Sequence, residues 1–223
     1  MTLQIGDIAP DFTAETTEGL IHFHEWAANS WVILFSHPKD FTPVCTTELG
    51  AMADLMPEFM KRGVKVMGIS ADTIGRHIQW KDDIADVTGS QLNYPLIADT
   101  DLLVSKLYGM LPKEASGAGF RTAADNQTVR TVYVIAPDKS IKLMIMYPMS
   151  TGRDFNEILR VVDSVMLTAD HKVATPANWR QGDDVIILPS VSNDDAQTMF
   201  QSGWTSPKPY IRYVPQSALK ARS

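Results

Sequence analysis

Cysteine is almost absent from this sequence. The 223 residues include one, Cys45. A single cysteine excludes an internal disulfide and is typical of proteins in a reducing compartment. The opening residues, MTLQIGDIAPDF, lack the basic and apolar stretches of a secretory signal. We therefore expect a cytoplasmic protein.

Two further absences narrow the possible functions. Asp and Glu outnumber Lys and Arg by 26 to 20, so no excess of positive charge indicates a nucleic-acid partner. The chain also has no run of about 18 apolar residues, so we expect no membrane-spanning segment. Its hydrophobic fraction, 44%, is that of a globular protein with a sizeable core.

Short apolar runs alternate with helical patterns over most of the chain. Residues 31–35, 64–71 and 94–98 are typical of buried strands. A helix is predicted from about Thr42 to Gly63, with Pro57 expected to kink or split it. A second helix is predicted around residues 74–87, between two of these strands.

The later part of this region predicts a hairpin and a final helix. Residues 129–135 and 141–147 are rich in β-branched and aromatic side chains and flank the turn sequence APDKS. Residues 151–154 have the form of a capping box ahead of an amphipathic helix, whose apolar residues recur with helical spacing between Phe155 and Met166. The order of elements predicts an α/β fold whose mixed sheet combines parallel crossovers with one hairpin.

The composition changes after about residue 168. Proline, small polar and acidic residues dominate, and only residues 185–188 and 210–214 form short apolar runs. A segment of this kind is not expected to bury much core alone. We therefore divide the chain into a domain of residues 1–167 and an arm of residues 168–223 that packs on that domain or on a partner subunit.

The sequence around Cys45 predicts a helix that begins just before it. In DFTPVCTTE, Thr42 can serve as the N-cap, which places Pro43 at the first helical position and Cys45 at the third. The unpaired N–H groups and partial positive charge at a helix N-terminus stabilise a thiolate, which is the nucleophilic form of cysteine. The alternative is a buried structural cysteine.

The stretch FSHPKDFTPVCTTELG resembles the active-site signature of peroxiredoxins, Pro-x-x-x-Thr/Ser-x-x-Cys, through Pro38, Thr42 and Cys45. The segments YPMSTGRDFNEILRVVDSVML and KVATPANW resemble the one-cysteine subgroup with a long C-terminal arm. The resemblance extends from GDIAPDF to KPYIRYVPQ. It implies a thioredoxin-like domain, an arm that packs across a homodimer partner, and chemistry that needs no metal, haem or flavin.

The resemblance also implies roles for single residues. Cys45 would attack the outer oxygen of a hydroperoxide and become a sulfenic acid. Thr42 would offer its hydroxyl to the thiolate and the peroxide, and Pro38 would shield the site from water.

Four further residues match supporting positions of the family. Arg130 would stabilise the thiolate and the leaving oxygen, although an arginine at a strand end can also extend to solvent. Glu48 would orient Arg130, or be an ordinary surface glutamate, and Arg153 would complete the network. His37 would tune Cys45 or stabilise its oxidised form, or would simply pack in the core.

The predicted activity is a thiol-dependent peroxidase that reduces hydrogen peroxide and organic hydroperoxides. The alternative is a redox sensor or holdase chaperone switched by oxidation of Cys45. Because no second cysteine exists, the reductant is external, thiol or other, or Cys45 pairs with Cys45 of another subunit. A homodimer or a larger homo-oligomer is expected.

Two weaker patterns occur in the sequence. Ser30, His24 and Asp138 match a phospholipase-type set found in some relatives, but ANSWV lacks the flanking glycines and Ser30 precedes its strand. His22 and His24 have the spacing of a metal clip on a strand, yet no further ligand is spaced nearby. Neither pattern predicts the main function.

Overall fold

The computed structural model describes residues 3–113 and 127–219. The chain divides into two compact units, Met1–Phe155 and Asn156–Ser223. The first unit holds a seven-stranded sheet in the order β2-β1-β5-β4-β3-β6-β7. The strands are β1 (Thr13–Thr16), β2 (Gly19–His22), β3 (Trp31–Ser36), β4 (Val64–Ser70), β5 (Leu96–Ala98), β6 (Arg130–Ile135) and β7 (Ile141–Tyr147).

The sheet is mixed, as predicted. β3 pairs with β4 and β4 with β5 in parallel, whereas β6 pairs antiparallel with β3 and with β7. The apolar runs of β3 and β4 are long and continuous because both strands are central and buried on both faces. The short β1–β2 hairpin at the other edge of the sheet was not predicted from the sequence.

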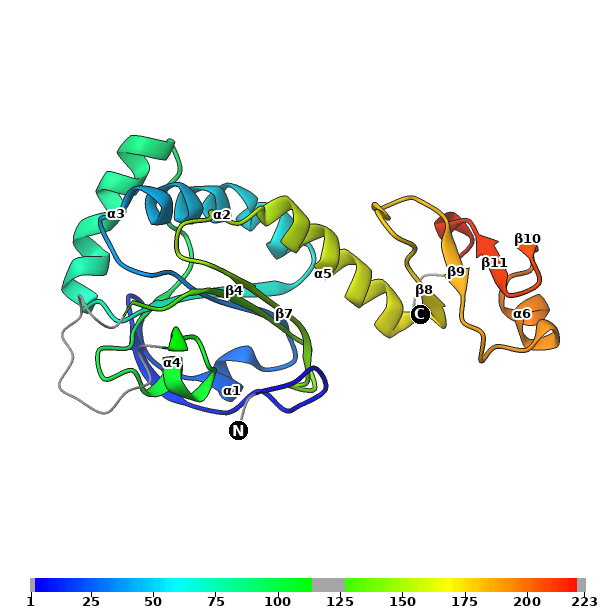
Figure 1. Ribbon diagram of the computed structural model, residues 1–223, viewed down its shortest axis with the longest axis horizontal. Coiled ribbons are helices and arrows are strands. Elements are labelled where there is room, and N and C mark those ends of the chain that lie inside the picture. The colour runs from blue at the N-terminus through cyan, green and yellow to red at the C-terminus, as the bar shows by residue number, and fades with distance from the viewer. Residues whose placement is uncertain (1–2, 114–126, 220–223) are drawn as a thin grey trace. The chain divides into compact units, whose positions relative to one another are not determined.

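Helices cover both faces of this sheet (Figure 1). On one side lie α2 (Pro43–Lys61) and α3 (Ile74–Thr88), and on the other lie α1 (Phe23–Ala27) and α4 (Leu103–Leu107). Tyr133 and Ile135 of β6 belong to the apolar cluster that includes residues of α1 and α4. Because side chains alternate along a strand, Arg130 points to the opposite face, the one under α2.

The predicted split of α2 at Pro57 is wrong. The helix is continuous from Pro43 to Lys61 with Pro57 inside it. An interior proline removes one backbone hydrogen bond, but Met56 and Phe59 on either side are buried, at 5% and 0% exposure. Packing of the flanking turns against the sheet therefore keeps both halves in one helix.

The second unit contains a small domain of its own. It comprises α5 (Phe155–Asp170) beyond its first residue, α6 (Asn193–Met199) and a four-stranded sheet in the order β10-β11-β9-β8. The strands are β8 (Val173–Ala174), β9 (Val185–Ile187), β10 (Thr205–Lys208) and β11 (Ile211–Val214). The composition predicted little buried core for this part of the chain, but the unit has an apolar cluster of its own. Trp179, 1% exposed, belongs to it together with buried side chains from β9, α6 and β11.

None of the helices in the described part of the chain has the length and apolar character needed for a bilayer crossing.

Candidate active site

Cys45 lies at the start of α2, directly after the loop that follows β3. Thr42 occupies the N-cap position with an extended backbone, and Pro43 is the first helical residue, as predicted. Cys45 is therefore the third helical residue, and it is fully buried. Its position in the first turn places the sulfur at the positive end of a helix of 19 residues.

Arg130 reaches Cys45 from β6. Its Nη1 lies 3.4 Å from Cys45 Sγ and 2.6 Å from Glu48 Oε2. Its Nε and Nη2 both donate to the carbonyl of Met149, at 2.8 and 2.5 Å. Arg130 is only 3% exposed, so the alternative of an arginine that extends to solvent is wrong. Its guanidinium is fixed on three sides with one N–H directed at the sulfur.

Glu48 links two arginines. It lies one turn after Cys45 on α2 and is 3% exposed, so it is not a surface glutamate. Arg153 donates to it three times, from the backbone N (2.8 Å), Nε (2.9 Å) and Nη2 (2.7 Å). Burial alone would raise the pKa of Glu48, but the hydrogen bonds and charge of Arg153, with the charge of Arg130, hold that pKa below 4.5.

Arg153 is held equally firmly. Its Nη1 donates to the carbonyls of Ser36 and Thr131, at 2.8 and 3.1 Å. Its guanidinium carbon lies 5.1 Å from the ring centre of Phe35 and 5.3 Å from that of Phe155.

The position of Arg153 also corrects the predicted capping box. The helix α5 begins at Phe155, so Thr151 lies outside its first turn. The backbone N–H of Arg153 donates to Glu48 instead of taking part in a helix cap.

The charged side chains around Cys45 have a net positive charge. Arg130 and Arg153 carry two positive charges, and Glu48 carries one negative charge. With a neutral thiol this buried group would have a net charge of +1, whereas a thiolate at Cys45 brings it to zero. An unbalanced charge is costly to bury, and Arg130 Nη1 lies 3.4 Å from the sulfur, where its N–H could donate to an anion.

Two residues of the signature complete the loop. Pro38 is buried. The Thr42 hydroxyl makes no side-chain cap and instead donates to the Lys39 carbonyl at 2.8 Å. The hydroxyl proton is therefore taken by a bond within the loop, and the hydroxyl oxygen can still accept a hydrogen bond.

His37 belongs to a separate buried cluster. Its Nε2 lies 2.8 Å from Asp40 Oδ1, and Asp40 Oδ2 lies 2.7 Å from Nδ1 of His77 on α3. His37, Asp40 and His77 are the residue types that bind metals, and the structure brings them together. Their mutual distances are those of direct hydrogen bonds, however, so we describe them as a hydrogen-bonded cluster.

Asp40 and His77 were missed by the sequence reasoning. The sequence pattern could have indicated that His77 is buried, because His77 shares one face of α3 with the buried residues Trp80 and Ile84. A histidine in such a stripe needs a partner.

In the described part of the chain, the residues of the phospholipase-type set do not interact directly with one another. His24 Nε2 lies 2.8 Å from the Ala9 carbonyl, and Asp138 accepts from the backbone and hydroxyl of Ser140. Ser30 precedes β3, as predicted. Among residues 3–113 and 127–219, no hydrogen bond or ion pair connects His24, Ser30 and Asp138 to one another.

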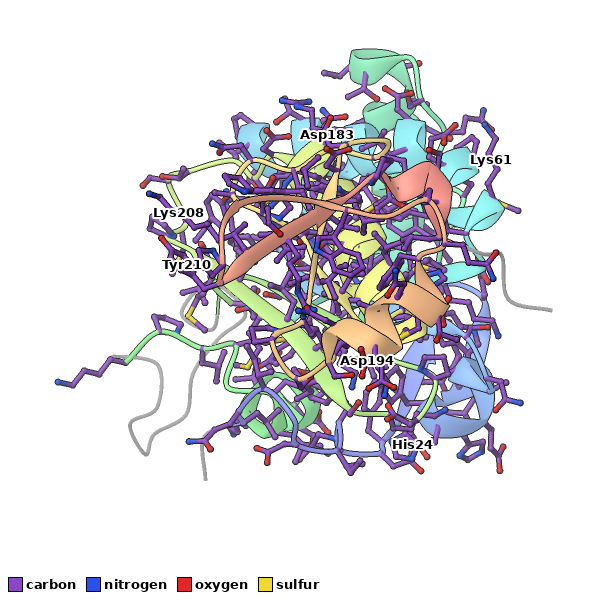
Figure 2. The ribbon with its side chains drawn as sticks, turned by 90° about the vertical axis from the view of Figure 1, so that its right-hand side faces the viewer. His24, Lys61, Asp183, Asp194, Lys208 and Tyr210 are labelled. Carbon is purple, nitrogen blue, oxygen red and sulfur yellow. The ribbon has the colours of Figure 1, made fainter. Side chains whose placement is uncertain are left out.

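His22 and His24 do not lie on one strand. His24 lies on the short helix α1 at the surface of the first unit (labelled in Figure 2), with a side chain 30% exposed. His22 ends β2, where its Nδ1 contacts the Thr13 hydroxyl at 2.8 Å. The change from strand to helix between them removes the spacing of a clip.

The comparisons with known proteins identify the family. The model of the AhpC/TSA family matches residues 5–144, and that of the C-terminal domain of 1-Cys peroxiredoxin matches residues 165–203. The chain belongs to the peroxiredoxin family, in its 1-Cys branch. A 1-Cys peroxiredoxin of Dictyostelium discoideum is 46% identical, over 96% of this chain and 86% of its own length. Peroxiredoxin-6 of Gallus gallus is 48% identical, over 96% and 98%.

Solved structures agree with this assignment. A peroxiredoxin 6 mutant of Arenicola marina is 44% identical with a TM-score of 0.86, over 96% of this chain and 98% of that one. A yeast mitochondrial 1-Cys peroxiredoxin is 44% identical with a TM-score of 0.88, over 96% and 100%. This peroxiredoxin therefore has the predicted thioredoxin-like α/β fold with a C-terminal extension, and the predicted family is confirmed.

Proposed function

We propose that Cys45 reduces hydrogen peroxide and organic hydroperoxides, assisted by Arg130, Glu48 and Arg153. Peroxiredoxins are thiol-dependent peroxidases, and this chain follows the one-cysteine scheme. The observation that carries the residue assignment is the Arg130 guanidinium, which lies 3.4 Å from the sulfur and is held by Glu48 and by the Met149 carbonyl.

The first step is a displacement at oxygen. The Cys45 thiolate attacks the terminal oxygen of R–O–OH, an S–O bond forms and the O–O bond breaks. The sulfur is oxidised to a sulfenic acid, and the leaving RO⁻ takes up a proton to become an alcohol, or water when the substrate is hydrogen peroxide. Negative charge moves from the sulfur to the leaving oxygen, and an N–H of Arg130 is placed to follow it.

The remaining residues of the site are proposed to position Arg130, Cys45 and the peroxide. Glu48 and Arg153 hold Arg130 in place, so little reorganisation is needed as charge moves. Thr42 is proposed to hydrogen-bond the peroxide through its hydroxyl oxygen, and the buried Pro38 to exclude water. His37 is proposed to tune Cys45 or to stabilise its oxidised form.

The second half of the cycle needs an external reductant. A thiol RSH would convert the sulfenic acid into a mixed disulfide and water, and a second RSH would release the Cys45 thiol and RSSR. Glutathione and thioredoxin are the systems named for the yeast relative, and we propose a thiol of this class here. A non-thiol reductant and a Cys45–Cys45 pairing between subunits remain the alternatives to test.

We further propose a homodimer, or a larger homo-oligomer, that includes the arm of residues 168–223. The single cysteine supports a reducing compartment such as the cytoplasm, although the yeast relative is mitochondrial.

Steady-state peroxide consumption tests this proposal. The wild-type protein and Cys45→Ser are assayed with glutathione, thioredoxin and ascorbate in turn. Catalytic turnover with a thiol, abolished in Cys45→Ser, is expected. Turnover that survives in Cys45→Ser would contradict the proposal, and turnover with ascorbate alone would replace the thiol by a non-thiol reductant.

A further inference from the structure

The buried cluster of His37, Asp40 and His77 needs one more proton than its ordinary forms supply. All three side chains have 0% exposure. His77 Nδ1 lies 2.7 Å from Asp40 Oδ2, and its Nε2 lies 3.1 Å from the Ile97 carbonyl oxygen. A neutral imidazole has one N–H, a carbonyl only accepts, and a carboxylate only accepts. With neutral His77 and ionised Asp40, one of these two contacts would join two acceptors.

The extra proton could be on His77 or on Asp40. Burial raises the pKa of Asp40, but hydrogen bonds from His37 and His77 lower it to about 2. Asp40 also faces a second donor, because His37 Nε2 lies 2.8 Å from its Oδ1. An ionised Asp40 can accept from both histidines at once, one at each carboxylate oxygen.

We propose that His77 is a buried imidazolium paired with Asp40, and that this pair keeps His37 neutral with its Nδ1 free of a proton. Asp40 has one negative charge, and His77 already balances it. A second imidazolium at His37 would be an unpaired buried charge, which is costly.

The surroundings of His37 support the same state. Its Nδ1 is buried and has no hydrogen-bond partner among the residues that the structure describes. A proton on Nδ1 would therefore be an unsatisfied donor. The carbonyl of His37 accepts from the Thr128 hydroxyl, and the ring packs 5.5 Å from the ring centre of Trp80, so neither supplies a negative charge.

A charged pair beside the cluster also balances itself. Asp72 Oδ2 accepts from the backbone N–H of Asp40 at 2.8 Å. Asp72 Oδ1 in turn accepts from Arg76 Nε at 2.9 Å. Arg76 pairs with Asp72, so Asp72 is not a free counter-charge for a protonated His37.

This makes Asp40 and His77 positioning residues for the active-site loop. His37 directly follows β3, and the same loop leads into α2 and Cys45. Because of the Asp40–His77 pair, Nε2 of His37 carries a proton and donates to Asp40, while Nδ1 of His37 has no proton and stays an acceptor in that loop. The role of that acceptor in peroxide reduction rests on the proposed function, but the protonation states do not.

The test uses ¹⁵N-histidine NMR on the full-length reduced protein at pH 7, without peroxide. We expect both ring nitrogens of His77 to carry protons and His37 to carry one, on Nε2. His77→Gln removes the positive charge and keeps an N–H that can reach Asp40, so His37 should gain a second proton. His22→Gln, a change at an exposed histidine, should leave the His37 spectrum unchanged.

Asp40→Asn covers the case in which His77→Gln does not fold. Asparagine has the shape of aspartate and can both accept from His37 and donate to His77, so the hydrogen bonds persist without charge. His77 should then become neutral while His37 stays neutral. A neutral His77 in the wild-type protein, or an unchanged His37 in folded His77→Gln, would overturn the proposal. Stoichiometric metal in the purified protein by mass spectrometry would also overturn it.

A kinetic readout separates positioning from folding. The pH profile of Cys45 oxidation by hydrogen peroxide should change in Asp40→Asn and stay unchanged in His22→Gln. Lower stability with an unchanged pH profile would reduce Asp40 to a structural role. The NMR result stands even if the chain proves to have no peroxidase activity, so the two proposals can fail separately.

Discussion

Replacement of Arg130 by methionine tests how the site activates its cysteine. The change removes the N–H that lies 3.4 Å from Cys45 Sγ and the bond of 2.6 Å to Glu48. Methionine keeps much of the apolar volume of the stem. Glu48 retains three hydrogen bonds from Arg153, so we expect the variant to fold.

The size of the effect follows from what is lost. A hydrogen bond to a charged group contributes about 1.5–3 kcal/mol, and loss of one donor to a developing anion slows catalysis by about 10²–10³-fold. Arg130 serves both the thiolate before the reaction and the leaving oxygen during it. We therefore expect the second-order rate constant for Cys45 oxidation to fall by at least about 100-fold.

The assay is stopped-flow fluorescence of the reduced protein mixed with hydrogen peroxide. The matched control is Arg62→Met, at the other end of α2, where Arg62 donates a hydrogen bond to the partly exposed Glu58. Seventeen residues separate Arg62 from Cys45, about 25 Å along the helix, so the control should react like the wild-type protein. A folded Arg130→Met protein that reacts within about threefold of the control would refute this reasoning.

Three further predictions concern the buried carboxylates and the phospholipase-type set. Glu48→Gln leaves two buried guanidinium groups without their anion and should lower the free energy of unfolding by about 3 kcal/mol in urea titration. Glu58→Gln, at a partly exposed pair screened by solvent, should lower it clearly less than Glu48→Gln does, and equal losses would contradict the assigned burial. Asp40 has a folded-state pKa of about 2 against an ordinary value of 3.8. The ionised Asp40 therefore stabilises the folded state by about 2 kcal/mol above about pH 4, and this contribution is lost as the pH falls towards 2. Acid titration should show this slope in the wild-type protein and a smaller one in Asp40→Asn; equal slopes would count against it. Finally, Ser30→Ala should not change hydrolysis of phosphatidylcholine vesicles, and a Ser30-dependent activity would show that the three residues meet in solution.

Local signals in the sequence predicted much of the fold. The apolar runs of β3 and β4 and the turn between β6 and β7 depend on residues close in the chain, and all were predicted. Thr42 and Pro43 predicted the start of α2 for the same reason. The helix is not split at Pro57, because packing of the adjacent turns is a tertiary effect that local propensity does not contain.

The candidate site was predicted through family resemblance rather than through physical pattern. Arg130 lies 85 residues from Cys45 and Arg153 lies 105 from Glu48, so their contacts depend on the topology of the sheet. Asp40 and His77 were missed because their pairing spans 37 residues. A buried histidine is visible in the α3 pattern, but its charge state depends on partners that only the fold brings together.

The most direct test of the central claim is a single-turnover reaction of reduced protein with hydrogen peroxide, followed by mass spectrometry of the trapped product. We expect one sulfenic acid per chain, located at Cys45, formed orders of magnitude faster than from free cysteine and absent in Cys45→Ser. A rate close to that of free cysteine would contradict it, and would leave oxidation of Cys45 as a slow switch, as in a sensor or holdase.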